Sequence, residues 1–306
     1  MKNRTAEEVE IGGQGPEARE IQPPARGWWR GVRWLLAFYL VLLLAMTFLE
    51  TWLVYPIPPV DAGDWHPAGL EFEDVWLTSQ DGTKLHGWFV ARPQAKRAIV
   101  YCHGNGEDVS MNADFVAQLS DALDASVLIF DYRGYGHSEG TPTEAGCIAD
   151  GLAAQQWLAE RIGRRPSDVV VMGRSIGGAI ATAIAAEQGA RALVLVNAFS
   201  RMTDVAAHHY RWLPVRLAMK NRYDSVARIR NFTGPVFQCH GAADWIVPIE
   251  LGRELFAAAP TSQKRFVEFA GRGHNDPEPM SFYGELADFL DDVDEETKAA
   301  AAKPSG

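Results

Sequence analysis

Gly173, Ser175 and Gly177 form a Gly-x-Ser-x-Gly motif in the middle of the chain. The motif follows the apolar run Val-Val-Val-Met at residues 169–172 and precedes a stretch of small residues. This order predicts a strand that turns tightly into a helix, a nucleophile elbow, with the serine at the turn. The turn lifts the hydroxyl clear of the backbone, where a histidine can remove its proton. Ser175 is therefore the predicted nucleophile.

Two polar residues further along the chain can complete a catalytic triad with this serine. Asp244 lies in a loop after the predicted strand 236–240, and His274 comes after the predicted strand 265–269. We expect the three side chains to lie together, because the carboxyl ends of parallel strands meet at one edge of a sheet. His274 would take the serine proton and later return it to the leaving group, while Asp244 would hold the imidazole tautomer.

Each member of this set also has a simpler structural interpretation. An aspartate such as Asp244 is a common turn former, and His274 could belong to an ordinary glycine-rich loop. Three other carboxylates compete for the role of the acid: Asp131, Asp276 and Glu278. Asp131 precedes the nucleophile in the chain, and Asp276 is close to the histidine in sequence. The ordered coincidence of serine, aspartate and histidine favours the triad.

A serine nucleophile also needs backbone N–H groups that stabilise the oxyanion. Ile176, the residue after the serine, is the first predicted donor. The second is predicted in the loop His103-Gly104-Asn105-Gly106, after the apolar run 98–102. The N–H of Asn105 is our candidate there.

A long apolar segment precedes all of these motifs. Residues 34–53 read WLLAFYLVLLLAMTFLETWL, and Glu50 is their only charged residue. About 20 apolar residues are enough for a helix to span a bilayer. Trp34, Trp52 and Tyr55 lie near the two edges, where aromatic rings prefer the headgroup zone. Basic residues precede the segment and acidic residues follow it, which predicts a cytoplasmic N-terminus and an extracytoplasmic catalytic domain.

Two other interpretations of this segment are open. One is a cleaved secretory signal, but the preceding polar stretch is long and no clear small-x-small cleavage site follows. The other is a buried core helix, which its length and its place near a chain end disfavour. We therefore predict an uncleaved single-pass anchor.

Beyond this segment, strand-like and helix-like stretches alternate, which predicts a parallel sheet with helices on both faces. A hairpin is predicted around Asp81-Gly82. Residues 200–232 interrupt the alternation, and we interpret them as a small cap above the strand ends, with a packed surface excursion as the alternative.

The expected parts are a disordered cytoplasmic tail at 1–30, a transmembrane anchor at 31–55, a linker at 56–67, the catalytic domain at 68–294 and a disordered tail at 295–306.

Composition argues against several other classes of protein. The formal net charge of −10 disfavours a nucleic-acid partner, which needs a basic face. The three cysteines show no metal-type spacing. Cys102-His103 and Cys239-His240 look like nucleophile–base pairs, but neighbours on a strand point to opposite faces. Adjacent histidines on one helix point apart, so we do not expect His208 and His209 to bind one metal ion. We expect no metal and no cofactor.

With these motifs assembled, the chain resembles the α/β-hydrolase superfamily over about residues 70–293. The resemblance implies a mostly parallel eight-stranded sheet with helices on both faces and a small cap. Within the superfamily the chain is similar to membrane-anchored α/β-hydrolase-domain proteins labelled serine aminopeptidase-like, whose members are implicated in ester, thioester and lipid hydrolysis. The resemblance rests on 103–106, 131–136, 173–178, 240–244 and 273–274, together with 212–216 and 223–225.

The expected function is that of a membrane-anchored serine hydrolase of the carboxylesterase or thioesterase type. It would cleave an ester, thioester or lipid-like substrate through Ser175, Asp244 and His274 and an acyl-enzyme intermediate. One alternative is a serine aminopeptidase or amidase, which needs a carboxylate to hold a substrate ammonium. The other is a catalytically silent, membrane-tethered scaffold whose cap binds a partner, against which the intact triad argues.

Overall fold

The computed structural model describes residues 26–301. Residues 1–25 of the tail predicted at 1–30 lie outside the described residues, and residues 26–30 are helical rather than disordered. The chain divides into two compact units, Met1–Ala45 and Met46–Gly306. Helix α1 (Arg26–Val54) begins in the first unit and ends in the second. It is the one helix of the described residues that is long and apolar enough to cross a membrane.

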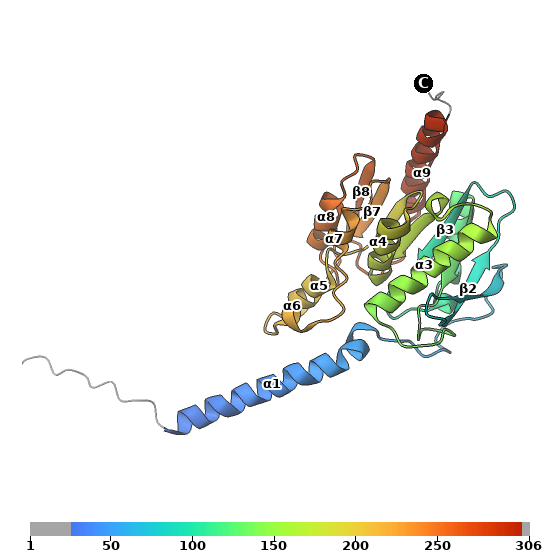
Figure 1. Ribbon diagram of the computed structural model, residues 1–306. Coiled ribbons are helices and arrows are strands. Elements are labelled where there is room, and N and C mark those ends of the chain that lie inside the picture. Colours follow the sequence, from blue (N-terminus) through green and yellow to red (C-terminus); the bar gives the residue numbers. More distant parts are fainter. Residues whose placement is uncertain (1–25, 302–306) are drawn as a thin grey trace, which may run out of the picture. The chain divides into compact units, whose positions relative to one another are not determined.

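The second unit is built on a single eight-stranded sheet in the order β1-β2-β4-β3-β5-β6-β7-β8 (Figure 1). β1 and β2 form the antiparallel hairpin predicted around Asp81-Gly82, β2 also pairs antiparallel with β4, and the other pairs are parallel. The expected mostly parallel sheet is therefore confirmed. The strands are β1 (Glu73–Thr78), β2 (Lys84–Val90), β3 (Arg97–Cys102), β4 (Ala125–Phe130), β5 (Val170–Arg174), β6 (Leu193–Val196), β7 (Val236–Gly241) and β8 (Lys264–Phe269).

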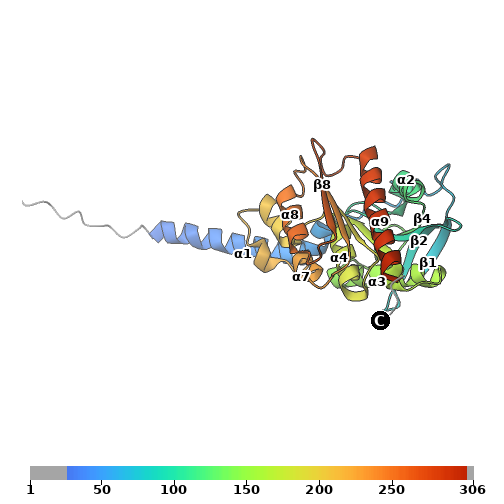
Figure 2. The same ribbon diagram turned by 90° about the horizontal axis from the view of Figure 1, so that it is seen from above.

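Helices cover both faces of this sheet (Figure 2). One face carries α2 (Ala113–Leu123) and α9 (Met280–Ala301). The other face carries α3 (Glu144–Arg161), α4 (Ile176–Gln188), α7 (Ser225–Ile229) and α8 (Ile249–Ala258). Two short 3₁₀ turns, Val109–Met111 and Pro166–Asp168, complete the connections.

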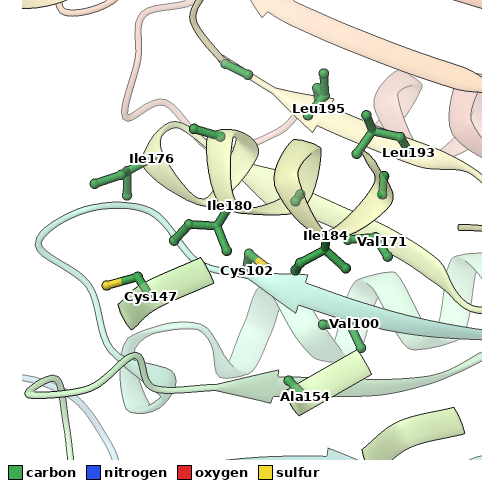
Figure 3. Packing of buried hydrophobic residues seen from close by; sticks show 14 of the residues in the cluster. Val100, Cys102, Cys147, Ala154, Val171, Ile176, Ile180, Ile184, Leu193 and Leu195 are labelled. Carbon is green, nitrogen blue, oxygen red and sulfur yellow. The ribbon is translucent and has the colours of Figure 1, made fainter. Parts of the chain in front are cut away.

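Alternate residues of the central strands enter opposite layers of the core, as the two-residue period of a strand requires. In β3, Val100 packs into the α3–α4 layer and Tyr101 into the α2–α9 layer. Figure 3 shows Ile180 and Ile184 of α4 among these buried side chains. Gly151 of α3 lies directly against them, because a Cβ there would come within 2.6 Å of Ile184. The two helices α3 and α4 therefore pack closely against each other on this face of the sheet.

The predicted interruption between β6 and β7 contains three short helices. α5 (Met202–His209) and α6 (Val215–Ala218) precede α7, and α6 corresponds to the helical stretch predicted at 215–219. An antiparallel bridge joins Arg201 to Asp224 and closes the base of this segment. We call residues 200–232 the cap.

The C-terminal end of the domain differs from the sequence-based expectation. The disordered tail predicted from residue 295 begins inside α9, which continues to Ala301. Residues 295–301 read EETKAAA, and most of these residue types have a high helix propensity, so the helix extends beyond its last buried residue, Val293. Residues 302–306 lie outside the described part of the chain.

Burial makes a testable prediction about the cysteines, all three of which are unpaired and buried. Burial raises the pKa of the Cys102 and Cys239 thiols, and it raises that of Cys147 to about 12. Since the thiolate is the reactive form, we expect none of the three to react with Ellman's reagent at mildly alkaline pH in the folded protein. All three should react in guanidinium, and a fast-reacting thiol in the native protein would contradict this packing.

Candidate active site

Ser175 lies at the turn between β5 and α4, as its sequence context predicts. Its backbone has φ 54° and ψ −118°, a conformation that non-glycine residues rarely adopt. Such strain persists only where the surrounding structure enforces it. The hydroxyl is therefore held at the carboxyl edge of the sheet by the path of the backbone.

Two glycines make this turn possible. A Cβ on Gly177 would lie 2.1 Å from the carbonyl oxygen of Cys102, at the end of the neighbouring strand β3. A Cβ on Gly173 would lie 2.1 Å from the carbonyl oxygen of Gly177. Both obstacles are backbone atoms that no side-chain rotation can move. The first turn of α4 can approach β3 only because these positions have no side chain.

The structure brings the three predicted triad residues together. His274 Nε2 lies 3.0 Å from Ser175 Oγ, and His274 Nδ1 lies 2.6 Å from Asp244 Oδ2. Both Asp244 and His274 are buried. The arrangement can pass the serine proton to the imidazole while the carboxylate holds the opposite ring nitrogen.

The carboxylate of Asp244 is held in its charged form by several donors. Its Oδ1 accepts hydrogen bonds from the N–H groups of Ile246 (2.9 Å) and Val247 (2.8 Å). Burial alone would raise the pKa of Asp244, but interactions with His240 and His274 outweigh this and keep the pKa below its usual value. His240 Nε2 lies 3.4 Å from Oδ2. This contact of His240 could not be predicted from the sequence, because no local motif signals it.

Residues at the ends of other strands hold the loop that carries His274 through hydrogen bonds to its backbone. The carbonyl oxygen of His274 accepts hydrogen bonds from Arg174 Nη2 (2.8 Å) and Asn197 Nδ2 (3.1 Å). Asn197 Oδ1 in turn accepts the N–H of Gly241 at 2.9 Å. The ends of β5, β6 and β7 are thereby tied to the histidine, which fixes its distance from Ser175.

The predicted oxyanion donors lie on either side of the serine. β3 and β5 are neighbours, but the chain leaves them in opposite directions along the sheet, and such a switch point opens a crevice. Asn105 and Ile176 line one cavity of about 250 Å³ together with Ser175 and His274. Within residues 26–301, no protein acceptor binds the N–H of Asn105 or of Ile176. The rest of the lining includes the apolar side chains of Phe199, Met202, Val205, Ile246 and Val247.

The side chain of Asn105 makes two contacts that sequence analysis did not foresee. Its Nδ2 donates to the carbonyl oxygen of Val54 at 2.7 Å, and its Oδ1 accepts from the hydroxyl of Tyr135 at 2.8 Å. Val54 is the last residue of α1 and belongs to the same compact unit as the site. The loop that follows β3 is thus held between the end of α1 and the loop after β4.

The competing carboxylates have other partners. Asp131 Oδ1 accepts the N–H of Val109, and Asp276 Oδ2 accepts the N–H of Gly273. Glu278 is half-buried, and desolvation raises its pKa. Among the described carboxylates, Asp244 alone contacts His274. No group of three or more potential ligand side chains that could hold a metal occurs in the described ranges.

Comparisons with known proteins identify the family of the chain. The chain is 40% identical over 225 residues to the uncharacterised Mycobacterium tuberculosis protein Rv2307c, covering 73% of this chain and 78% of the relative. It is 30% identical over 265 residues to the α/β-hydrolase domain-containing protein WAV2 of Arabidopsis thaliana, covering 80% and 84%. The chain belongs to the α/β-hydrolase superfamily. Residues 93–225, which include Ser175, match the family described as "Serine aminopeptidase, S33".

Two further matches concern the hydrolase fold and its known activities. The lysophosphatidylserine lipase ABHD12 of Danio rerio is 30% identical over 242 residues, which is 71% of this chain and 60% of that protein. The Pyrococcus furiosus esterase Pf2001 is similar in fold, with a TM-score of 0.64 at 21% identity over 77% of this chain and 98% of that one. Both matches agree with the α/β-hydrolase fold of the chain.

The glycine contacts predict a sharp difference between two glycine-to-alanine variants. Gly177→Ala is expected to lower the free energy of unfolding by about 3 kcal/mol, because its methyl group would overlap backbone atoms of β3. Gly284→Ala is the matched control, since a Cβ there meets nothing within 4 Å and α9 should gain about 0.5–1 kcal/mol. Guanidinium unfolding followed by circular dichroism measures both. Equal midpoints for the two variants would contradict the close approach.

Proposed function

We propose that this protein is a membrane-anchored serine hydrolase that cleaves carboxylic ester or thioester bonds with Ser175, Asp244 and His274. The observation that carries the proposal is the continuous contact from hydroxyl to imidazole to buried carboxylate, at 3.0 and 2.6 Å. The depressed pKa of Asp244 keeps that carboxylate negative at neutral pH, where it favours the imidazolium that forms during the reaction.

In the proposed mechanism, His274 Nε2 removes the proton of Ser175 as Oγ attacks the carbonyl carbon of the substrate. The N–H groups of Asn105 and Ile176 stabilise the negative oxygen of the tetrahedral intermediate. The intermediate collapses, and the imidazolium gives its proton to the departing alcohol or thiol. Water, deprotonated by the same histidine, then releases the acid from the acyl-enzyme.

The cavity and the relatives support an ester with an apolar acyl part. Five apolar side chains line the cavity beside the serine, and they give an alkyl chain a surface on which to pack. A lipase and an esterase among the similar proteins act on substrates of this chemical class. The apolar helix α1 supports a single-pass anchor, with the N-terminus in the cytoplasm and the catalytic domain outside it.

One observation favours the aminopeptidase alternative. Glu107 lines the cavity and could face the ammonium group of a peptide. Its Oε2, however, already accepts hydrogen bonds from the N–H of Gly104 (3.2 Å) and from Asn112 Nδ2 (3.4 Å). The ester proposal needs no such anion. A panel of aminoacyl arylamides, measured beside nitrophenyl esters, separates the two activities.

Replacement of the nucleophile tests the reaction itself. Ser175→Ala should lower p-nitrophenyl ester hydrolysis by about 10⁴-fold or more and abolish labelling by a fluorophosphonate, because no other group can form the acyl-enzyme. Ser281→Ala, at an exposed serine at the start of α9, is the control and should keep full activity. Undiminished turnover by the Ser175 variant would refute the mechanism.

The contacts of Asn105 predict an effect on turnover rather than on binding. Asn105→Ala keeps the backbone N–H but frees the loop from Val54 and Tyr135. A fully lost oxyanion donor costs about 10²–10³-fold in rate, so a loosened one should lower kcat by about tenfold with little change in KM. Tyr135→Phe removes one of the two contacts and should have a smaller effect. A change confined to KM would argue against an oxyanion role for this loop.

A further inference from the structure

The cap carries large apolar side chains that are at least half exposed to solvent. Leu217 is 88% exposed, Trp212 is 62% exposed and Tyr210 is 50% exposed. They lie on α6 and on the turn that joins it to α5 (Figure 1). Basic side chains occur between them in the sequence. We define the cap ridge as Tyr210, Arg211, Trp212, Arg216, Leu217 and Lys220.

The charge of this segment is opposite to that of the chain. Residues 205–223 contain four Arg and Lys residues and no Asp or Glu, whereas the whole chain has a net charge of −10. Arg216 pairs with Asp204 at the edge of the ridge. Within the described ranges, no carboxylate lies in ion-pair distance of Arg211 or Lys220. The ridge therefore presents free positive charge beside exposed aromatic and aliphatic side chains.

The end of α1 is hydrogen-bonded to the same part of the cap. Glu50 is buried, and its Oε1 accepts hydrogen bonds from the N–H groups of Lys220 (2.8 Å) and Asn221 (2.7 Å). Tyr55 continues the contact, because its hydroxyl donates to Asn221 Oδ1 at 2.8 Å. Glu50 precedes the helix end at Val54 by four residues, about 6 Å along the axis. Lys220, at one end of the ridge, therefore lies beside the last turns of α1.

We propose that the cap ridge docks onto the surface of the membrane that α1 crosses. Trp212 and Leu217 would enter the boundary between headgroups and acyl chains, as exposed aromatic and aliphatic residues do at such surfaces. Arg211 and Lys220 would contact anionic headgroups. The inference rests on the proposed anchor, and it adds a second contact with lipid that the anchor alone does not require.

Docking would also define where the substrate comes from. α5 lies between the ridge and the catalytic cavity, because Met202 and Val205 line that cavity while Ala207 and His208 line a separate hollow shared with Arg211. An ester held in the bilayer surface would meet the apolar side of the cavity without passing through bulk water. The substrate class is therefore an amphipathic acyl ester that resides in the membrane.

A fluorescent probe on the ridge tests the proposal in the full-length protein. Leu217→Cys is labelled with bimane, and the three native cysteines are buried and should not compete. Asp288→Cys on α9 is the matched exposed control, and α9 lies away from the cap (Figures 1 and 2). In nanodiscs of phosphatidylcholine and phosphatidylglycerol, we expect a blue shift and quenching by spin-labelled lipid at 217 and neither at 288.

Charge removal gives the second readout. Arg211→Gln and Lys220→Gln should each weaken docking on the anionic discs by about fivefold, and neither should matter on pure phosphatidylcholine. A blue shift without quenching by spin-labelled lipid would overturn the proposal in favour of contact between copies of this chain. An unshifted probe at 217 in protein that resists carbonate extraction would also overturn it. Release of the protein by carbonate would instead show that the anchor fails, while Ser175-dependent activity in detergent tests the chemistry separately.

Discussion

The close approach of α4 to the end of β3 is the constraint on which the site depends. Because a Cβ on Gly177 would lie 2.1 Å from the Cys102 carbonyl, the helix and the strand meet with only backbone between them. This contact forces Ser175 into its positive φ and raises the hydroxyl from the sheet. It also brings the N–H of Ile176 beside the loop of Asn105. One backbone contact thus positions the nucleophile and both predicted oxyanion donors.

Polar side chains then hold the remaining groups at fixed distances from the serine. Asn197 joins the end of β7 to the carbonyl of His274, and Arg174 binds the same carbonyl. Asp244 is satisfied by two backbone donors and by two histidines. A buried carboxylate with this many partners stays charged, so burial strengthens its hold on the imidazole rather than neutralising it.

The sequence predicts those parts of the site that depend on local pattern. Ser175, Asp244 and His274 could be placed at one edge because each follows a predicted strand, and the carboxyl ends of parallel strands meet at one edge of the sheet. The Asp81-Gly82 hairpin could be predicted from its turn residues. The contact of Asn105 with Val54 and that of His240 with Asp244 could not, since neither has a spacing that marks it. The disorder expected from residue 295 is wrong for residues 295–301, where helix propensity is high and α9 continues without buried side chains, among those described, to mark it.

Glu50 shows why the last turns of α1 belong to the catalytic unit. A buried carboxylate in an apolar helix needs donors that compensate for its lost hydration, and here two backbone N–H groups and an amide of the cap bind Oε1, while Oε2 is buried without a hydrogen-bond partner among the described residues. Asn221, which binds Glu50, is followed closely in the chain by Tyr223, whose hydroxyl contacts that of Tyr55. The chain leaving α1 then passes Asn105 at Val54. The helix end therefore touches both the cap and the oxyanion loop, so a disturbance at residues 50–55 would reach the proposed chemistry through these hydrogen bonds.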